Sequence, residues 1–188
     1  MSQNLTDKNG LEIATLAAGC FWCTEAAFSI IKGVKRIEPG YTGGTVTNPS
    51  YSEVSTGTTG HAEAAQIYFD PEVISYKEIL EIFFTVHDPT SLNRQGADIG
   101  TQYRSAIFYH NQQQKEVAEK LIAELTEEKI WDNHIVTEVV PLKVFYNAET
   151  FHKDYYKKHP KEPYCQAVIA PKIAKLQHRF IDKIKVPL

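Results

Sequence analysis

Residues 11–31 place an apolar run directly before a helical pattern, with only Gly19 and Cys20 between the two. The run Leu11–Ala18 is long enough for one buried strand, and the apolar residues that follow recur at the spacing of a helix face. Gly33 then provides a helix stop. The chain therefore begins with a strand that passes into a helix at a cysteine, which favours a fold with a sheet and a helix layer.

The rest of the chain mixes strand and helix patterns, with no internal repeat or linker. Strands are predicted at 63–69 and 103–109, and a β-rich stretch at 135–146 contains Pro141, which indicates a bulge or a sheet edge. The other predicted elements are loops at 40–50 and 87–100, helices that open at the Ser75–Glu78 capping box and at Asn111 with Gln114, a short helix after Asn147, and a helix at 172–183.

Some of these strands follow one another without a helix between them, which argues against a regular alternation of strands and helices. The expected fold class is α+β, a two-layer α/β sandwich with a mixed sheet and flanking helices. A length of 188 residues suits a single domain. We therefore predict one catalytic domain over 1–188, in which residues 160–188 form a C-terminal tail that carries Cys165.

Charge and hydropathy argue against several classes of partner. The formal net charge is −3 and no block of five like charges occurs, so neither a nucleic-acid nor a membrane partner is expected. No stretch approaches the roughly 18 apolar residues that span a bilayer. Asp7, Lys8 and Glu12 precede Cys20, which argues against a lipoprotein signal. Three cysteines are too few for a secreted disulfide scaffold, so the chain is expected in the cytoplasm.

The strand-to-helix junction places the Cys20 thiol at a helix N-terminus, where the helix dipole and free N–H groups favour the nucleophilic thiolate. Cys23 follows three residues later, and three kinds of chemistry fit this arrangement. Cys20 and Cys23 could work as a general thiol–disulfide oxidoreductase. Together with Cys165 and His159 they could instead hold zinc in a binding module. Alternatively, Cys20 could attack an electrophilic substrate, with a second thiol clearing the oxidised enzyme.

Glu63 is the candidate general acid. In an alternating strand it shares one face with Ala65, Ile67 and Phe69, which are apolar. Burial on such a face disfavours the charged carboxylate, so the pKa of Glu63 should rise toward the neutral range that a general acid needs. The alternative is a strand-end glutamate that turns into solvent.

Three further polar residues, Tyr51, Asp98 and Tyr103, lie in or just after the two polar loops. A tyrosine hydroxyl can hold a polarised oxygen, although most tyrosines only fill space between polar and apolar surroundings. The histidines show no metal-ligand spacing, and His61 is interpreted as a loop or cap residue.

An ordered series of motifs runs from about residue 12 to residue 165. It comprises GCFW at 19–22 with Glu25, GYTGG at 40–44, NPSYSEV at 48–54, TGHAEA at 59–64, HDPT at 87–90, RQGADIGTQYRSAI at 94–107, and more weakly FHKDYY with PYC over 151–165. In this order and at this length, the motifs resemble the A class of peptide methionine sulfoxide reductases.

The resemblance implies reduction of methionine S-sulfoxide, free or in proteins and peptides, with no metal or other cofactor. Cys20 matches the family's nucleophile, which becomes a sulfenic acid and then a disulfide that thioredoxin or a similar dithiol reduces. In the family's arrangement the substrate methyl lies on aromatic rings and the sulfoxide oxygen lies among hydroxyl and carboxyl groups. The matching residues here are Phe21 and Trp22 for the methyl, Glu63, Tyr51 and Tyr103 for the oxygen, and Asp98 for the shape of the pocket.

The chain departs from the family pattern at three places. Many members have glycine where this chain has Cys23, and many have histidine where it has Ile99. The glycine-rich tail with two cysteines found in some members is replaced by a tail with Cys165 alone. Cys165 is therefore the expected main resolving thiol, and Cys23, one helical turn from Cys20, is the alternative.

Overall fold

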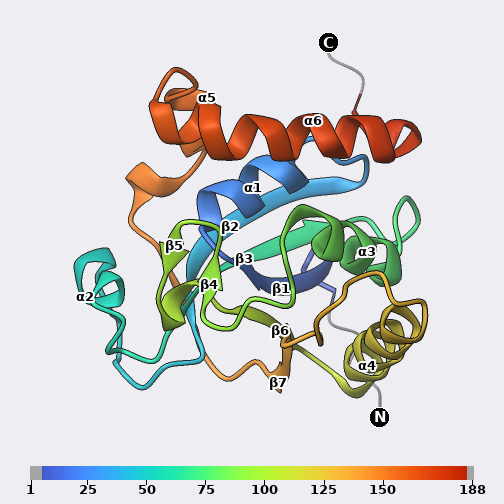
Figure 1. Ribbon diagram of the computed structural model, residues 1–188, viewed down its shortest axis with the longest axis horizontal. Coiled ribbons are helices and arrows are strands. Elements are labelled where there is room, and N and C mark those ends of the chain that lie inside the picture. The colour runs from blue at the N-terminus through green and yellow to red at the C-terminus, as the bar shows by residue number, and fades with distance from the viewer. Residues whose placement is uncertain (1–5, 186–188) are drawn as a thin grey trace.

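The computed structural model describes residues 6–185, and its centre is a six-stranded sheet with the strand order β7-β6-β1-β3-β2-β8 (Figure 1). β6 and β7 run parallel, whereas the other neighbouring pairs run antiparallel. Two short strands, β4 and β5, form a separate hairpin. The strands are β1 (Glu12–Ala18), β2 (Val34–Thr42), β3 (Ala62–Phe69), β4 (Arg94–Gln95), β5 (Asp98–Ile99), β6 (Ser105–Tyr109), β7 (Glu138–Pro141) and β8 (Phe145–Asn147).

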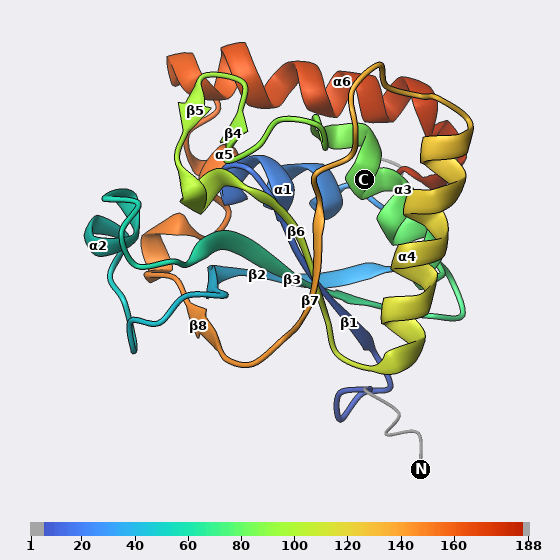
Figure 2. The same cartoon turned by 60° about the horizontal axis from the view of Figure 1, so that its bottom comes forward.

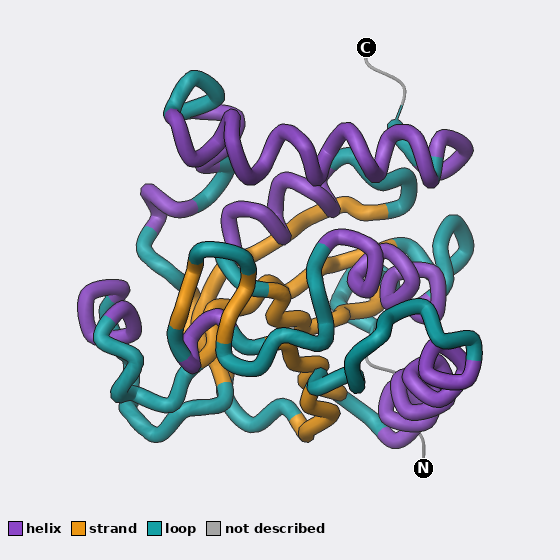
Figure 3. Tube along the Cα trace, viewed as in Figure 1, coloured by secondary structure: helices purple, strands orange, loops and turns teal. Residues whose placement is uncertain are grey.

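Helices cover one face of this sheet. α1 packs on β2 and β3, and α6 lies across α1 (Figures 1 and 3). α3 packs against β1 and α6, and α4 flanks the sheet at β6 and β7 (Figure 2). The α-helices are α1 (Phe21–Ser29), α2 (Tyr51–Ser55), α3 (Tyr76–Val86), α4 (Gln112–Glu127), α5 (Tyr155–Lys158) and α6 (Ala170–Arg179).

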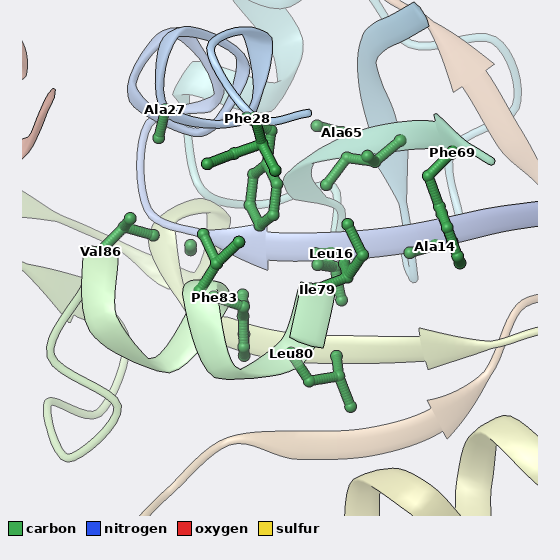
Figure 4. Close-up of a cluster of buried hydrophobic side chains, with 14 of the residues drawn as sticks. Ala14, Leu16, Ala27, Phe28, Ala65, Phe69, Ile79, Leu80, Phe83 and Val86 are labelled. Carbon is green, nitrogen blue, oxygen red and sulfur yellow. The ribbon is translucent and has the colours of Figure 1, made fainter. Parts of the chain in front are cut away.

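The main hydrophobic core lies between the sheet and this helix layer (Figure 4). Leu16 and Phe69 from the sheet meet Phe28 from α1 and Phe83 from α3, and all four side chains are fully buried. Each such burial stabilises the fold by about 1.5–3 kcal/mol. The opposite face carries small residues such as Ala17, Ala64 and Ala106, packed with Phe108. The predicted α+β sandwich with a mixed sheet is confirmed.

Two helix starts predicted from local capping signals are present. Ser75 Oγ accepts from the Glu78 N–H at 3.2 Å, and Glu78 Oε2 accepts from the Ser75 N–H at 2.8 Å. At the start of α4, Asn111 Oδ1 accepts from the Gln114 N–H at 2.8 Å. Each cap satisfies helix N–H groups that have no partner within the helix, so the helix begins where the sequence predicts it.

Three predicted boundaries differ from the structure. Residues 40–42 belong to β2, not to a loop; an added Cβ at Gly40 would lie 2.3 Å from the Tyr146 carbonyl oxygen, so glycine here permits the close approach of β8. The β-rich stretch 135–146 divides into β7 and β8, which lie at opposite edges of the sheet, and Pro141 ends the edge strand β7. Tyr103 lies in a 3₁₀ turn at Thr101–Tyr103, and the strand begins at Ser105.

The C-terminal region is more helical than the sequence indicates. A π-helical turn at Cys165–Ile169 continues directly into α6, so the helix predicted from Lys172 begins earlier. Leu176 anchors α6 in the main core. Residues 186–188 of the predicted tail lie outside the described part of the chain. Within residues 6–185, no helix is both long and apolar enough to cross a membrane.

Candidate active site

Gly19 makes the turn from β1 into α1. Its φ of +90° lies in the region that favours glycine, and an added Cβ would lie 2.7 Å from the side chain of Gln95. This turn makes Cys20 the N-cap residue of α1, and Cys20 is 7% exposed. A glycine before the cysteine is therefore required both by the backbone and by the packing of the β4–β5 hairpin.

Glu63 reaches the same helix start from β3. Its Oε2 accepts a hydrogen bond from the backbone N–H of Phe21 at 3.0 Å, directly after Cys20. Glu63 is 2% exposed, and its burial raises the pKa of the carboxyl to about 8. The predicted burial of this carboxyl is confirmed, and the alternative of a solvent-facing glutamate is wrong. At neutral pH the group holds a proton beside Cys20.

The pKa values of the two thiols of the junction shift in opposite directions. Burial, the contact with Cys23 and the nearby Glu63 raise the pKa of Cys20 well above its ordinary value. The neighbouring Cys20 thiol lowers the pKa of Cys23 to about 7. Burial therefore opposes the Cys20 thiolate that the helix start is predicted to favour.

Phe21 and Trp22 form aromatic walls next to the thiol. Phe21 is buried, and its ring lies nearly parallel to that of Tyr51 at a centroid distance of 6.4 Å. The indole of Trp22 stacks on Tyr155 at 3.7 Å and 4°. Its Nε1–H donates to Nδ1 of His152 at 3.0 Å. The structure thus brings the two predicted aromatic residues together and adds a strap, residues 149–165, that covers Trp22.

Asp98 enters the same region from the β4–β5 hairpin. Its Oδ2 accepts from the hydroxyl of Tyr164 at 2.7 Å, and that hydroxyl lies 3.7 Å from Cys23 Sγ. Tyr103 packs against the apolar cluster that contains Cys20 and Cys23. Burial and then the proximity of Glu63 raise the pKa of both Tyr51 and Tyr103, so both hydroxyls keep their protons and can donate.

Known proteins with similar sequences point to the same enzyme class as the site residues. The pattern of the family described as peptide methionine sulfoxide reductase matches residues 12–184. The chain belongs to the peptide methionine sulfoxide reductase family. Peptide methionine sulfoxide reductase MsrA of Saccharolobus solfataricus is 56% identical over 176 residues, 94% of this chain and 98% of that protein.

Solved structures place the fold in the same family. The reduced form of Mxr1 from Saccharomyces cerevisiae has a TM-score of 0.78 and 35% identity, covering 85% of this chain and 92% of that one. Mxr1 in complex with Trx2 has a TM-score of 0.56 and 26% identity, covering 80% and 88%. The predicted enzyme class, a methionine sulfoxide reductase, is confirmed.

The third thiol of the reductase lies in the same cluster. Cys165 is completely buried and packs with Cys20 and Cys23, together with Ile169. All three thiols are free. Across residues 6–185, no three His, Cys, Asp or Glu side chains are arranged to hold a metal ion, so the zinc-stabilised module has no donor set there.

Several residues that complete the reductase site have no role predicted from the sequence. They lie on the strap or contact it: Glu25, Glu149, His152, Tyr155 and Tyr164. Glu25 is buried in α1, and its Oε1 accepts from the Asp154 N–H at 3.0 Å just before α5. The motifs FHKDYY and PYC include three of these residues, His152, Tyr155 and Tyr164. Their roles do not follow from the sequence, because contacts between the strap and α1 join positions about 130 residues apart.

His61 has the structural role that the sequence suggests. Its Nδ1 accepts from the Gly44 N–H at 3.0 Å, and its Nε2 donates to the Val46 carbonyl at 2.7 Å. The imidazole therefore holds the loop between β2 and Tyr51 in place through two hydrogen bonds to its backbone. His61 thereby helps to position Tyr51 in the site but does not contact the thiols.

Proposed function

We propose that this chain reduces the S epimer of methionine sulfoxide, in proteins and peptides and as the free amino acid, with Cys20 as nucleophile and Glu63 as acid. The observation that carries the proposal is the bond from the Phe21 N–H to Glu63, which holds a protonated carboxyl beside the Cys20 thiol. A nucleophile and an acid side by side suit attack on a polar S–O bond.

The chemical step balances without an external reagent. Cys20 attacks the sulfoxide, the S–O bond of the substrate breaks, and an S–O bond at Cys20 replaces it. The substrate sulfur gains the two electrons that Cys20 loses, so the products are methionine and a Cys20 sulfenic acid. Glu63 gives its proton to the departing oxygen and regains one from the Cys20 thiol, so no net proton is consumed.

The surrounding side chains orient the substrate for this step. We infer that the substrate methyl lies against Phe21 and Trp22, whose rings form the apolar walls beside the thiol. The hydroxyls of Tyr51 and Tyr103 stabilise the oxygen as its charge develops. Asp98, bound to Tyr164, shapes the pocket from the hairpin side.

This arrangement predicts a strong preference for one sulfoxide epimer. Because the methyl walls and the oxygen site are fixed, an epimer that exchanges the two groups cannot fit both. Turnover of N-acetyl-methionine sulfoxide of defined chirality, with dithiothreitol as reductant, should proceed for the S epimer and be negligible for the R epimer. Comparable rates for the two epimers would contradict the proposed pocket.

The resolving step can follow two routes. Cys165, in the C-terminal tail, is the main resolving thiol expected from the sequence, but it is buried in a helical turn. Cys23 packs in one buried cluster with Cys20, and its pKa of about 7 supplies a thiolate near neutral pH. We infer that Cys23 condenses first with the sulfenic acid and that Cys165 then takes over the disulfide.

An external dithiol completes the cycle, and we propose thioredoxin. Support comes from the complex of Mxr1 with Trx2, whose Mxr1 chain resembles this one. A dithiol reductant of this kind suits a reducing compartment, for which we propose the cytoplasm.

Disulfide mapping tests the order of the thiols. After oxidation by one equivalent of substrate, the first disulfide found by peptide mass should join Cys20 to Cys23, and links to Cys165 should appear later. Cys165→Ser should keep the first turnover but impair thioredoxin-driven turnover. An early Cys20–Cys165 link in the unmodified protein would show that Cys165 resolves the sulfenic acid directly.

A further inference from the structure

The indole of Trp22 is hydrogen-bonded to the imidazole of His152, whose other ring nitrogen has no hydrogen-bond partner. Because the Trp22 Nε1–H donates to His152 Nδ1, that nitrogen must be unprotonated and the neutral ring must carry its proton on Nε2. His152 is completely buried, and its Nε2 has no hydrogen-bond partner in the structure. A buried donor of this kind calls for a functional explanation.

Glu149 faces the unpaired proton. Its Oε2 lies 3.9 Å from His152 Nε2, which is beyond hydrogen-bond distance. The same carboxylate accepts from the Tyr41 hydroxyl and from the Tyr51 N–H, each at 3.2 Å. Tyr51 is the first residue of α2 and Tyr41 lies in β2. Glu149 therefore connects the wall that carries Tyr51 to the imidazole that holds Trp22.

We propose that Glu149 and His152 are positioning residues, which form a carboxylate–imidazole–indole relay that sets the orientation of the Trp22 ring. A movement of about 1 Å would bring Glu149 and His152 into hydrogen-bond distance. The relay rests on the proposed function, because its purpose is to place Trp22 against the substrate methyl. The relay also connects Trp22, which contacts the substrate methyl, to Tyr51, which contacts the sulfoxide oxygen. The Glu149 carboxylate therefore helps to position both binding groups of the substrate.

Acid should break this relay. Protonation of His152 puts a hydrogen on Nδ1 and removes the acceptor for Trp22. Burial lowers the pKa of His152 below 6.5, while the Glu149 charge opposes that shift. The other titratable or charged groups near the ring are Tyr51 on α2, Glu63 on β3, Cys20 before α1, Tyr155 on α5, and Lys153, whose amine binds Glu38.

The nearest of these neighbours stay neutral in acid. Burial raises the pKa of Tyr51, Glu63 and Cys20, so each is neutral below pH 6.5. Tyr155 also has a raised pKa, first because its hydroxyl binds Glu162. Glu25, three residues after Trp22 in α1, also has a raised pKa because it is buried, so the loss of the transition in His152→Gln is what assigns the transition to His152.

The sequence offers a direct probe, because Trp22 and Trp131 are its two tryptophans. Trp131 packs near Phe84, away from the thiol cluster, so Trp131→Phe leaves Trp22 as the one tryptophan, whose emission is excited selectively at wavelengths that tyrosine does not absorb. In this background the emission of Trp22 should change with a midpoint below pH 6.5. His152→Gln should abolish that transition, and Glu149→Gln should move its midpoint to lower pH, because the charge that raises the pKa of His152 is gone.

Steady-state kinetics provide the second readout. His152→Gln and Glu149→Gln should each raise KM for N-acetyl-methionine sulfoxide about three- to tenfold, the effect of one hydrogen bond, with a smaller change in kcat. Glu127→Gln, an exposed glutamate on α4, is the matched control and should change neither readout.

An unchanged transition in His152→Gln, or an unchanged KM in both variants, would overturn the relay. The fluorescence readout does not depend on turnover, so the two proposals can fail separately. The transition without sulfoxide reduction would support the relay and remove the proposed function. Sulfoxide reduction without the transition would remove the relay alone.

Discussion

Cys20→Ser should abolish sulfoxide reduction while the protein stays folded. A serine hydroxyl at neutral pH is a far weaker nucleophile than a thiol and cannot form the sulfenic acid. The substitution is nearly isosteric, and Cys20 lies at the start of α1, not in the main core. Methionine release in a single turnover, measured by chromatography, should fall to the uncatalysed level, with an unchanged circular dichroism spectrum.

The matched controls are the other two thiols. Cys23→Ser and Cys165→Ser should each release one equivalent of methionine in a single turnover, because neither thiol takes part in attack on the sulfoxide. Appreciable turnover by Cys20→Ser, or the loss of the first turnover in Cys165→Ser, would contradict the assignment of the nucleophile.

Glu63→Gln should slow the chemical step by about 10²–10⁴-fold, the usual contribution of a positioned acid. Glutamine keeps the shape and a hydrogen-bond donor but cannot give up a proton. Single-turnover formation of methionine near pH 7 measures the effect, with Glu127→Gln as the control. An unchanged rate would mean that Glu63 does not protonate the departing oxygen.

The pH dependence of the same step gives a second test of Glu63. The carboxyl is protonated below its pKa of about 8 and charged above it. Because the protonated form is the acid, its contribution to the rate is full below pH 8 and is lost as the pH rises through that value. This fall should be absent in Glu63→Gln.

The parts of the fold predicted correctly depend on local signals. The turn at Gly19, the capping box at Ser75 and the cap at Asn111 each act within a few residues, so the sequence alone reveals them. The burial of Glu63 was also predictable, because alternation along one strand defines which face meets the core.

The errors concern contacts between distant segments. The sequence predicts a loop at Gly40, because the role of this glycine in permitting the close approach of β8 depends on a strand about 100 residues later. The raised pKa of Cys20 depends on packing by β3 and the strap, which local helix geometry does not reveal. The sequence indicates a tail around Cys165 and not a helix, because the π-helical turn before α6 has no clear local pattern.

A single-turnover experiment on Cys23→Ser/Cys165→Ser tests the central claim most directly. With both possible resolving thiols removed, one equivalent of methionine S-sulfoxide should leave the oxidised nucleophile trapped, and dimedone should label it as a sulfenic acid. The account predicts one methionine released for each dimedone adduct, with the adduct located on the Cys20 peptide by mass. Methionine release without an adduct at Cys20 would contradict it.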